Sequence, residues 1–151
     1  MRAAIGTVGL AIYAAFVLLV TLTPTPVDSG LQGSIDKVLG KLHAHGLPAW
    51  FQYPQLEFTA NIAFFVPIGF FLALLVPWRA WWLCILIGPV FSGALEFAQG
   101  AFLPDRFSSV GDVIANSTGS LIGSIAAFAL RSVVEARDRR VIAAAVVAAA
   151  R

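Results

Sequence analysis

Charge is scarce in this sequence. Only 12% of its 151 residues are Asp, Glu, Lys or Arg, against ~25% in typical soluble domains, whereas 59% are hydrophobic. A soluble globular protein is therefore nearly excluded. The formal net charge of +2 is small, and the sequence has no nucleic-acid-binding footprint.

Cysteine and recognised catalytic patterns are also lacking. Cys84 is the only cysteine, which excludes disulfide scaffolds and paired-thiol redox or zinc chemistry. Neither Gly-x-Ser-x-Gly nor His-Glu-x-x-His occurs, which argues against a serine hydrolase or a zinc protease. His43 and His45 are two positions apart and point to different sides of a helix, so we expect no metal site and no cofactor.

Long apolar runs, in contrast, are frequent. A membrane-spanning helix needs about 20 mostly apolar residues, because each adds ~1.5 Å of rise toward ~30 Å of hydrocarbon. Four stretches qualify, at residues 3–22, 58–76, 80–101 and 110–130. They predict an all-α integral membrane protein, a four-transmembrane-helix bundle over residues 1–130, followed by a basic and Ala-rich tail over 131–151. The first stretch is longer than the apolar core of a signal peptide, which favours an uncleaved anchor.

The distribution of basic residues predicts the orientation, because cytoplasmic loops carry an excess of Lys and Arg. With the N-terminus inside, the outer side holds only Lys37, Lys41 and Arg106. The inner side then holds Arg2, Arg79, Arg131, Arg137, Arg139, Arg140 and Arg151. We therefore expect a multi-pass protein of the bacterial cytoplasmic (inner) membrane, with both termini in the cytoplasm.

The first outer segment, residues 23–57, contains a helical pattern. Leu31, Ile35, Leu39 and Leu42 recur at helical spacing with charged residues between them. This pattern predicts an amphipathic helix that lies at the outer interface.

Three of the predicted spans carry polar side chains, which are costly in a membrane and therefore mark candidate functional sites. They are Asn61, Glu96, Gln99, Asp112 and Asn116. Counted from the outer ends of their spans at ~1.5 Å per residue, all five lie between about 3 and 9 Å deep. Glu96 and Gln99 are three residues apart and Asp112 and Asn116 four apart, so each pair is expected to share a helix face.

The outer loop above these side chains carries Arg106, which we expect to pair with Glu96 or Asp112. Together the six residues predict an outward-facing polar pocket formed by three helices. A different interpretation is a satisfied polar network that only fixes helix register. Small residues could already fulfil that packing role, since Ala115, Gly119, Gly123 and Ala127 form a seam at spacing of four.

Transport and catalysis are two further functions that such a bundle could have. A transporter site usually lies at the membrane midplane, whereas these polar groups lie near one face, and a conduit would require a homo-oligomer. An intramembrane enzyme could use Glu96 and Asp112 as acid and base on a lipid-linked envelope substrate. The sequence permits this chemistry without indicating it, and we assign no catalytic residue.

At these positions the sequence resembles the VanZ-like family of small bacterial membrane proteins. The resemblance lies in residues 61–70, in Ser92 to Glu96 with Gln99, and in Arg106 through Asp112, Asn116 and Gly119, and it covers roughly residues 10–130. The family's recurrent polar positions match Asn61, Glu96, Gln99, Arg106, Asp112 and Asn116. The resemblance implies membership of a group whose namesake is associated with resistance to teicoplanin, a lipoglycopeptide.

An outer polar pocket fits such a phenotype. It would hold a membrane lipid headgroup, a lipid-linked cell-wall precursor or the polar part of the drug. Asn61, Gln99 and Asn116 would supply hydrogen bonds, and Arg106 would pair with anionic groups. Our leading hypothesis is therefore a binding protein of the cell envelope.

Overall fold

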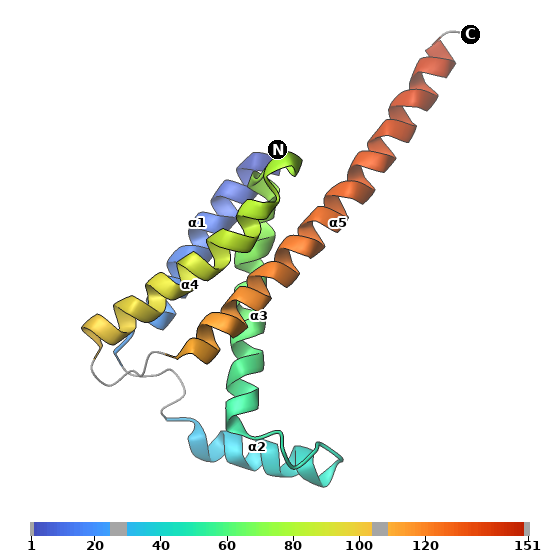
Figure 1. Ribbon diagram of the computed structural model, residues 1–151. Coiled ribbons are helices and arrows are strands. Elements are labelled where there is room, and N and C mark those ends of the chain that lie inside the picture. Colours follow the sequence, from blue (N-terminus) through green and yellow to red (C-terminus); the bar gives the residue numbers. More distant parts are fainter. Residues whose placement is uncertain (1, 25–29, 104–108, 150–151) are drawn as a thin grey trace.

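The computed structural model describes residues 2–24, 30–103 and 109–149, and every regular element within them is helical (Figure 1). Four helices are long and apolar enough to cross a membrane, which confirms the four predicted spans. The elements are α1 (Arg2–Thr21), α2 (Gln32–Ala44), α3 (Tyr53–Leu75), the short 3-10 helix η1 (Trp78–Ala80), α4 (Trp82–Phe102) and α5 (Val110–Ala149).

Two helices extend beyond the predicted spans. α3 begins at Tyr53 instead of residue 58, because Gln55 Oε1 accepts a hydrogen bond from the backbone N of Gln52 and Pro54 lies in the first turn. α5 does not end at residue 130 but continues to Ala149, 40 residues in all. The basic stretch after Leu130 contains no Gly or Pro that would end a helix.

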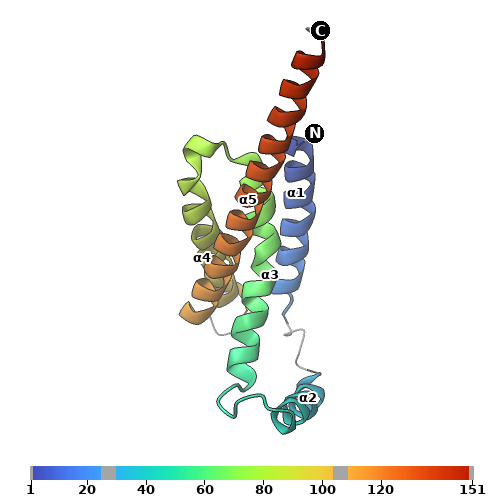
Figure 2. The same cartoon turned by 90° about the vertical axis from the view of Figure 1, so that its right-hand side faces the viewer.

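The predicted amphipathic helix is present as α2. Leu31, Val38 and Leu42 are exposed together, while Leu39 is buried. Figures 1 and 2 show α2 lying across the start of α3, beyond the ends of α4 and α5. This placement is the one expected of an interfacial helix when α3 crosses the membrane.

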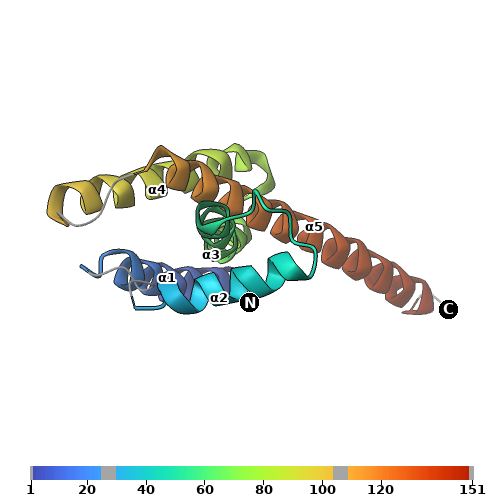
Figure 3. The same cartoon turned by 90° about the horizontal axis from the view of Figure 1, so that it is seen from below.

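α3 is the central helix of the bundle. It packs against α1 and, most extensively, against α5, which also packs against α4 (Figure 3). Its inward residues form much of the core, including Phe65, Ile68, Leu72 and Ala73.

Small residues bring α3 and α5 into close contact, as the predicted seam requires. Ala115 and Ala127 are fully buried. A Cβ atom added to Gly119 would overlap the backbone of Ile62, and one added to Gly123 would overlap that of Val66. These glycines therefore allow an approach that larger side chains would prevent.

Candidate functional site

Four of the predicted polar residues, Asn61, Glu96, Asp112 and Asn116, lie at the end of the bundle where α5 begins. Asn61 Nδ2 on α3 donates to Asp112 Oδ1 on α5 over 2.8 Å. α3 and α5 run in the same direction, and α5 begins beside the part of α3 that lies beyond its first two turns (Figure 1). This hydrogen bond joins two residues that are 51 positions apart in the sequence.

α4 contributes to the same end from the opposite direction. Glu96 Oε2 accepts a hydrogen bond from the backbone N of Ser109 over 2.9 Å, and Asn116 Nδ2 donates to Ser92 Oγ over 3.0 Å. α4 and α5 are antiparallel. Ser92 is one turn before Glu96 on α4, and it therefore meets Asn116, which is one turn after Asp112 on α5. We refer to Asn61, Ser92, Glu96, Ser109, Asp112 and Asn116 as the polar cluster.

Burial and charge define the character of the polar cluster. Glu96, Asn116 and Ser92 are buried. The Glu96 carboxylate lies at the N-terminus of α5, where the helix dipole favours negative charge. Glu96 and Asp112 both make further interactions beyond these hydrogen bonds.

Asn116 has one amide end without a partner. Its Nδ2 binds Ser92, but its Oδ1 is buried and has no hydrogen-bond partner among the described residues. Turning the amide over would leave the other end unpaired instead. A buried polar atom of this kind costs free energy unless a ligand or a water supplies the partner.

Gln99 departs from the predicted arrangement. Its Nε2 donates to the backbone O of Thr21 over 2.9 Å, so it caps the C-terminal end of α1. Glu96, three residues earlier, binds the segment before α5 instead. The spacing predicts that Glu96 and Gln99 face one pocket, but Gln99 contacts α1 and Glu96 contacts the start of α5. Arg106 lies outside the described residues.

The depth of Asn61 along its own helix also differs from the sequence estimate, whereas α5 begins at Val110 as predicted. Asn61 is eight residues from the start of α3 at Tyr53, or about 12 Å at ~1.5 Å per residue, instead of about 4.5 Å. α2 lies beyond the ends of α4 and α5 (Figure 2). The polar cluster is therefore recessed relative to α2.

Further along α5 from the polar cluster, toward the middle of the bundle, lie more buried polar groups. Ser120 and Ser124 are buried, and Ser124 Oγ donates to the backbone O of Gly69 over 3.1 Å. Within the part of the chain that the structure describes, no group of three or more His, Cys, Asp or Glu side chains could hold a metal ion.

A further buried polar residue is Arg131, whose place after an apolar run indicates only the orientation of the chain in the membrane. It lies near the other end of the bundle with 4% of its surface exposed. Its Nη1 donates to the backbone O atoms of Ala73 and Val76, each over 2.7 Å, and so caps the C-terminus of α3. One signal could have revealed this role, because Arg131 is the next position of the seam that runs through Gly123 and Ala127 at spacing of four.

A comparison with protein-family models matches residues 10–131 to the VanZ/LLP1 family. The chain belongs to this family. The match confirms the resemblance and extends from the third turn of α1 to Arg131. Comparisons with curated proteins and with solved structures find no match. As a VanZ/LLP1 family membrane protein with four candidate spans, the chain places its polar cluster inside the matched region.

Proposed function

We propose that this VanZ/LLP1 family protein binds the polar headgroup of a membrane lipid or of a lipid-linked cell-wall precursor at the polar cluster. The observation that carries the proposal is the buried Asn116 amide, one turn along α5 from Asp112, whose Oδ1 has no hydrogen-bond partner within residues 2–24, 30–103 and 109–149. Three helices contribute to this one end of the bundle. A register-fixing network would be expected to satisfy its own members, whereas a binding site keeps a hydrogen-bonding group for its ligand.

The distribution of charge supports an outward-facing site in the bacterial inner membrane. Arg2, Arg79 and the basic part of α5 lie toward the end opposite the polar cluster (Figure 1). By the positive-inside rule that end is cytoplasmic, so both ends of the chain are cytoplasmic and the polar cluster faces outward. The amphipathic α2 then lies in the interface of the outer leaflet, further from the membrane centre than the recessed polar cluster.

The residues would divide the work of binding. Asn61 and Asn116 offer hydrogen bonds, Asp112 and Glu96 provide negative charge, and Arg106 suits an anionic group such as phosphate because of its planar fork. Gln99 would act indirectly by holding α1 against α4. Occupation of this site by a lipid-linked precursor would lower susceptibility to lipoglycopeptides of the teicoplanin type.

Lipid retention tests the proposal directly. The wild-type protein and Glu96→Gln are expressed in one host, purified in a neutral detergent and compared by native mass spectrometry for bound lipid. We expect Glu96→Gln to retain roughly tenfold less of a specific lipid, the effect of weakening one charge-assisted hydrogen bond by about 1.4 kcal/mol. Asp138→Asn is the matched control, because it also replaces a carboxylate by its amide, at an exposed position of α5 outside the polar cluster.

A second readout is the teicoplanin susceptibility of a sensitive host that carries the wild type, Glu96→Gln, Arg106→Ala or Asp138→Asn at equal membrane abundance. We expect the wild type and Asp138→Asn to lower susceptibility and the other two to lose the effect. Equal lipid retention by all variants would contradict the proposal. A chemically modified lipid that forms only with the wild type would instead favour the intramembrane enzyme, since Glu96→Gln abolishes a general base.

A further inference from the structure

Arg131, the buried charged group at the end of the bundle opposite the polar cluster, uses only part of its hydrogen-bonding capacity. Both hydrogen bonds to the end of α3 come from Nη1. Nε is buried and has no partner among the described residues. The edge formed by Nε and Nη2 is the one with which arginine binds carboxylate or phosphate through two parallel hydrogen bonds.

The acidic side chain one turn further along α5 does not fill this role. Glu135 Oε1 accepts a hydrogen bond from Trp78 Nε1 over 3.2 Å and lies 3.6 Å from Arg2 Nη1. Arg2 and Glu135 are both close enough to interact electrostatically with Arg131. One carboxylate therefore serves two guanidinium groups, and this cluster of Arg2, Trp78, Arg131 and Glu135 carries a net positive charge.

The surroundings place the Arg131 cluster at a membrane boundary. The guanidinium carbon of Arg131 lies 4.9 Å from the ring centroid of Trp78 and 5.0 Å from that of Phe128. Trp78, Trp81 and Trp82 are 42%, 54% and 49% exposed, as expected of an aromatic belt at the level of lipid headgroups. Basic groups between helices at such a level are suited to anionic lipid headgroups.

We propose that the Nε and Nη2 edge of Arg131 binds the phosphate group of an anionic phospholipid at this end of the bundle. The lipid phosphate would complete the hydrogen bonding of Arg131, and Arg2 would add a second positive charge. The acyl chains would lie beside the apolar surface below the tryptophans. This site is separate from the polar cluster, which lies at the other end of α3, so either site can fail its test alone.

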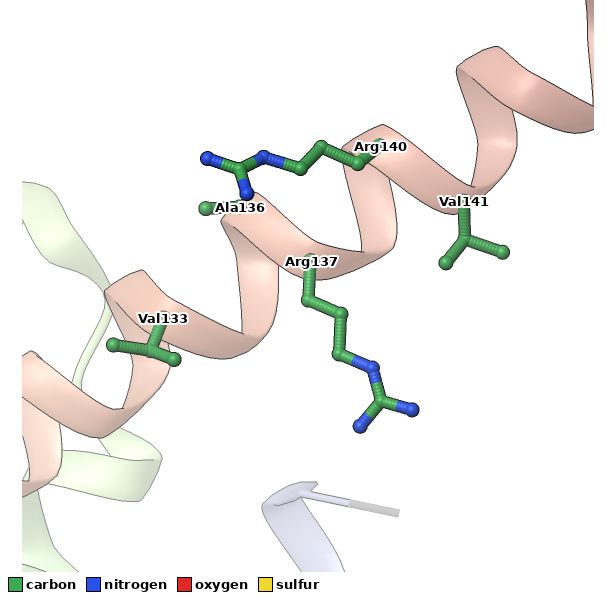
Figure 4. A pocket seen from close by; sticks show the side chains of 5 residues that line it. All are labelled: Val133, Ala136, Arg137, Arg140 and Val141. Carbon is green, nitrogen blue, oxygen red and sulfur yellow. The ribbon is translucent and has the colours of Figure 1, made fainter.

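The projecting part of α5 provides the control. Val133, Ala136, Arg137, Arg140 and Val141 line a surface hollow, but all five come from this one helix, and Arg140 runs back along it toward Ala136 (Figure 4). An Arg140→Gln change therefore removes the same charge from the same helix without touching the Arg131 cluster.

The test measures the melting temperature of the full chain in neutral detergent with added phosphatidylglycerol or phosphatidylcholine. We expect a rise of several degrees with phosphatidylglycerol and less than half of it with phosphatidylcholine, since only a ligand of the native state stabilises it. Arg131→Lys keeps a positive charge but cannot form two parallel hydrogen bonds to one phosphate. We expect this variant to bind phosphatidylglycerol roughly tenfold more weakly. Arg2→Gln, at an exposed position that keeps α3 capped, should weaken it less, and Arg140→Gln should leave it unchanged.

Three results would overturn the proposal. Equal stabilisation by the two lipids would show that the site does not select a lipid with a net negative headgroup. An equal loss in Arg140→Gln and Arg2→Gln would show a general attraction between basic residues and anionic lipid. If inorganic phosphate at matched ionic strength reproduced the whole effect, the ligand would be free phosphate and the assignment to a lipid would be wrong.

Discussion

Gly123→Ala is expected to lower the free energy of unfolding by about 2 kcal/mol, within the ~1–3 kcal/mol typical of overpacking. The added methyl group would overlap the backbone O of Val66 and would lie 2.8 Å from the backbone N of Phe70. Backbone atoms of a packed helix cannot rotate away as a side chain can. The change must therefore push α5 away from α3 and disturb the largest helix contact of the bundle. Unfolding in mixed micelles of neutral detergent and dodecyl sulfate would measure the loss.

Two other glycines supply controls for this prediction. An added Cβ at Gly93 on α4 meets nothing within 4 Å, so Gly93→Ala should be neutral or stabilising by up to ~1 kcal/mol through helix propensity. At Gly6 the added atom meets the Leu75 side chain, which can turn, so Gly6→Ala should have an intermediate effect. Equal stability of Gly123→Ala and Gly93→Ala would contradict the close approach of α3 and α5.

The same contact shows what the sequence could predict. Spacing of four between Ala115, Gly119, Gly123 and Ala127 identified the face of α5 that packs closely, because small residues at this spacing have few other uses in a span. The pattern did not identify the partner helix. α3 contributes backbone atoms of Ile62 and Val66 to the contact. Every residue has the same backbone atoms, so the residue types on α3 do not identify it as the partner.

Helix boundaries were less predictable than the existence of the helices. Hydropathy alone defined the predicted start at residue 58, but the capping residues Gln52 and Gln55 extend α3 to Tyr53. The charges after Leu130 suggested the end of a span, and they do end the apolar segment. Charge does not end a helix, however, and Glu, Arg and Ala are good helix formers, so α5 continues to Ala149.

For the candidate site, residue depth predicted which side chains would share one end of the bundle, but not their pairing. Asn61 and Asp112 lie at one level because α5 begins beside the part of α3 that carries Asn61. Gln99 binds Thr21 because α1 ends beside the last turns of α4, a neighbour relation that spacing along one helix cannot reveal. The pairing depends on the order of the helices around the bundle.

Arg131→Ala is expected to lower the free energy of unfolding by about 3 kcal/mol, since a hydrogen bond to a charged group contributes ~1.5–3 kcal/mol and two are lost. The backbone O atoms of Ala73 and Val76 would lose their cap at the end of α3. The stacking of the guanidinium on Trp78 and Phe128 would be lost as well. The same mixed-micelle unfolding experiment measures the change.

Arg137→Ala is the matched control for Arg131→Ala, because it removes an exposed arginine from the same helix and should change stability by no more than ~0.5 kcal/mol. Arg131→Lys should lose roughly half as much stability as Arg131→Ala, since one ammonium group can cap the end of α3 but cannot stack as a planar fork. A loss in Arg131→Ala no larger than that in Arg137→Ala would mean that α3 ends at Leu75 without help from α5. In that case Arg131 would be a residue of membrane orientation alone, as its position after an apolar run first suggested.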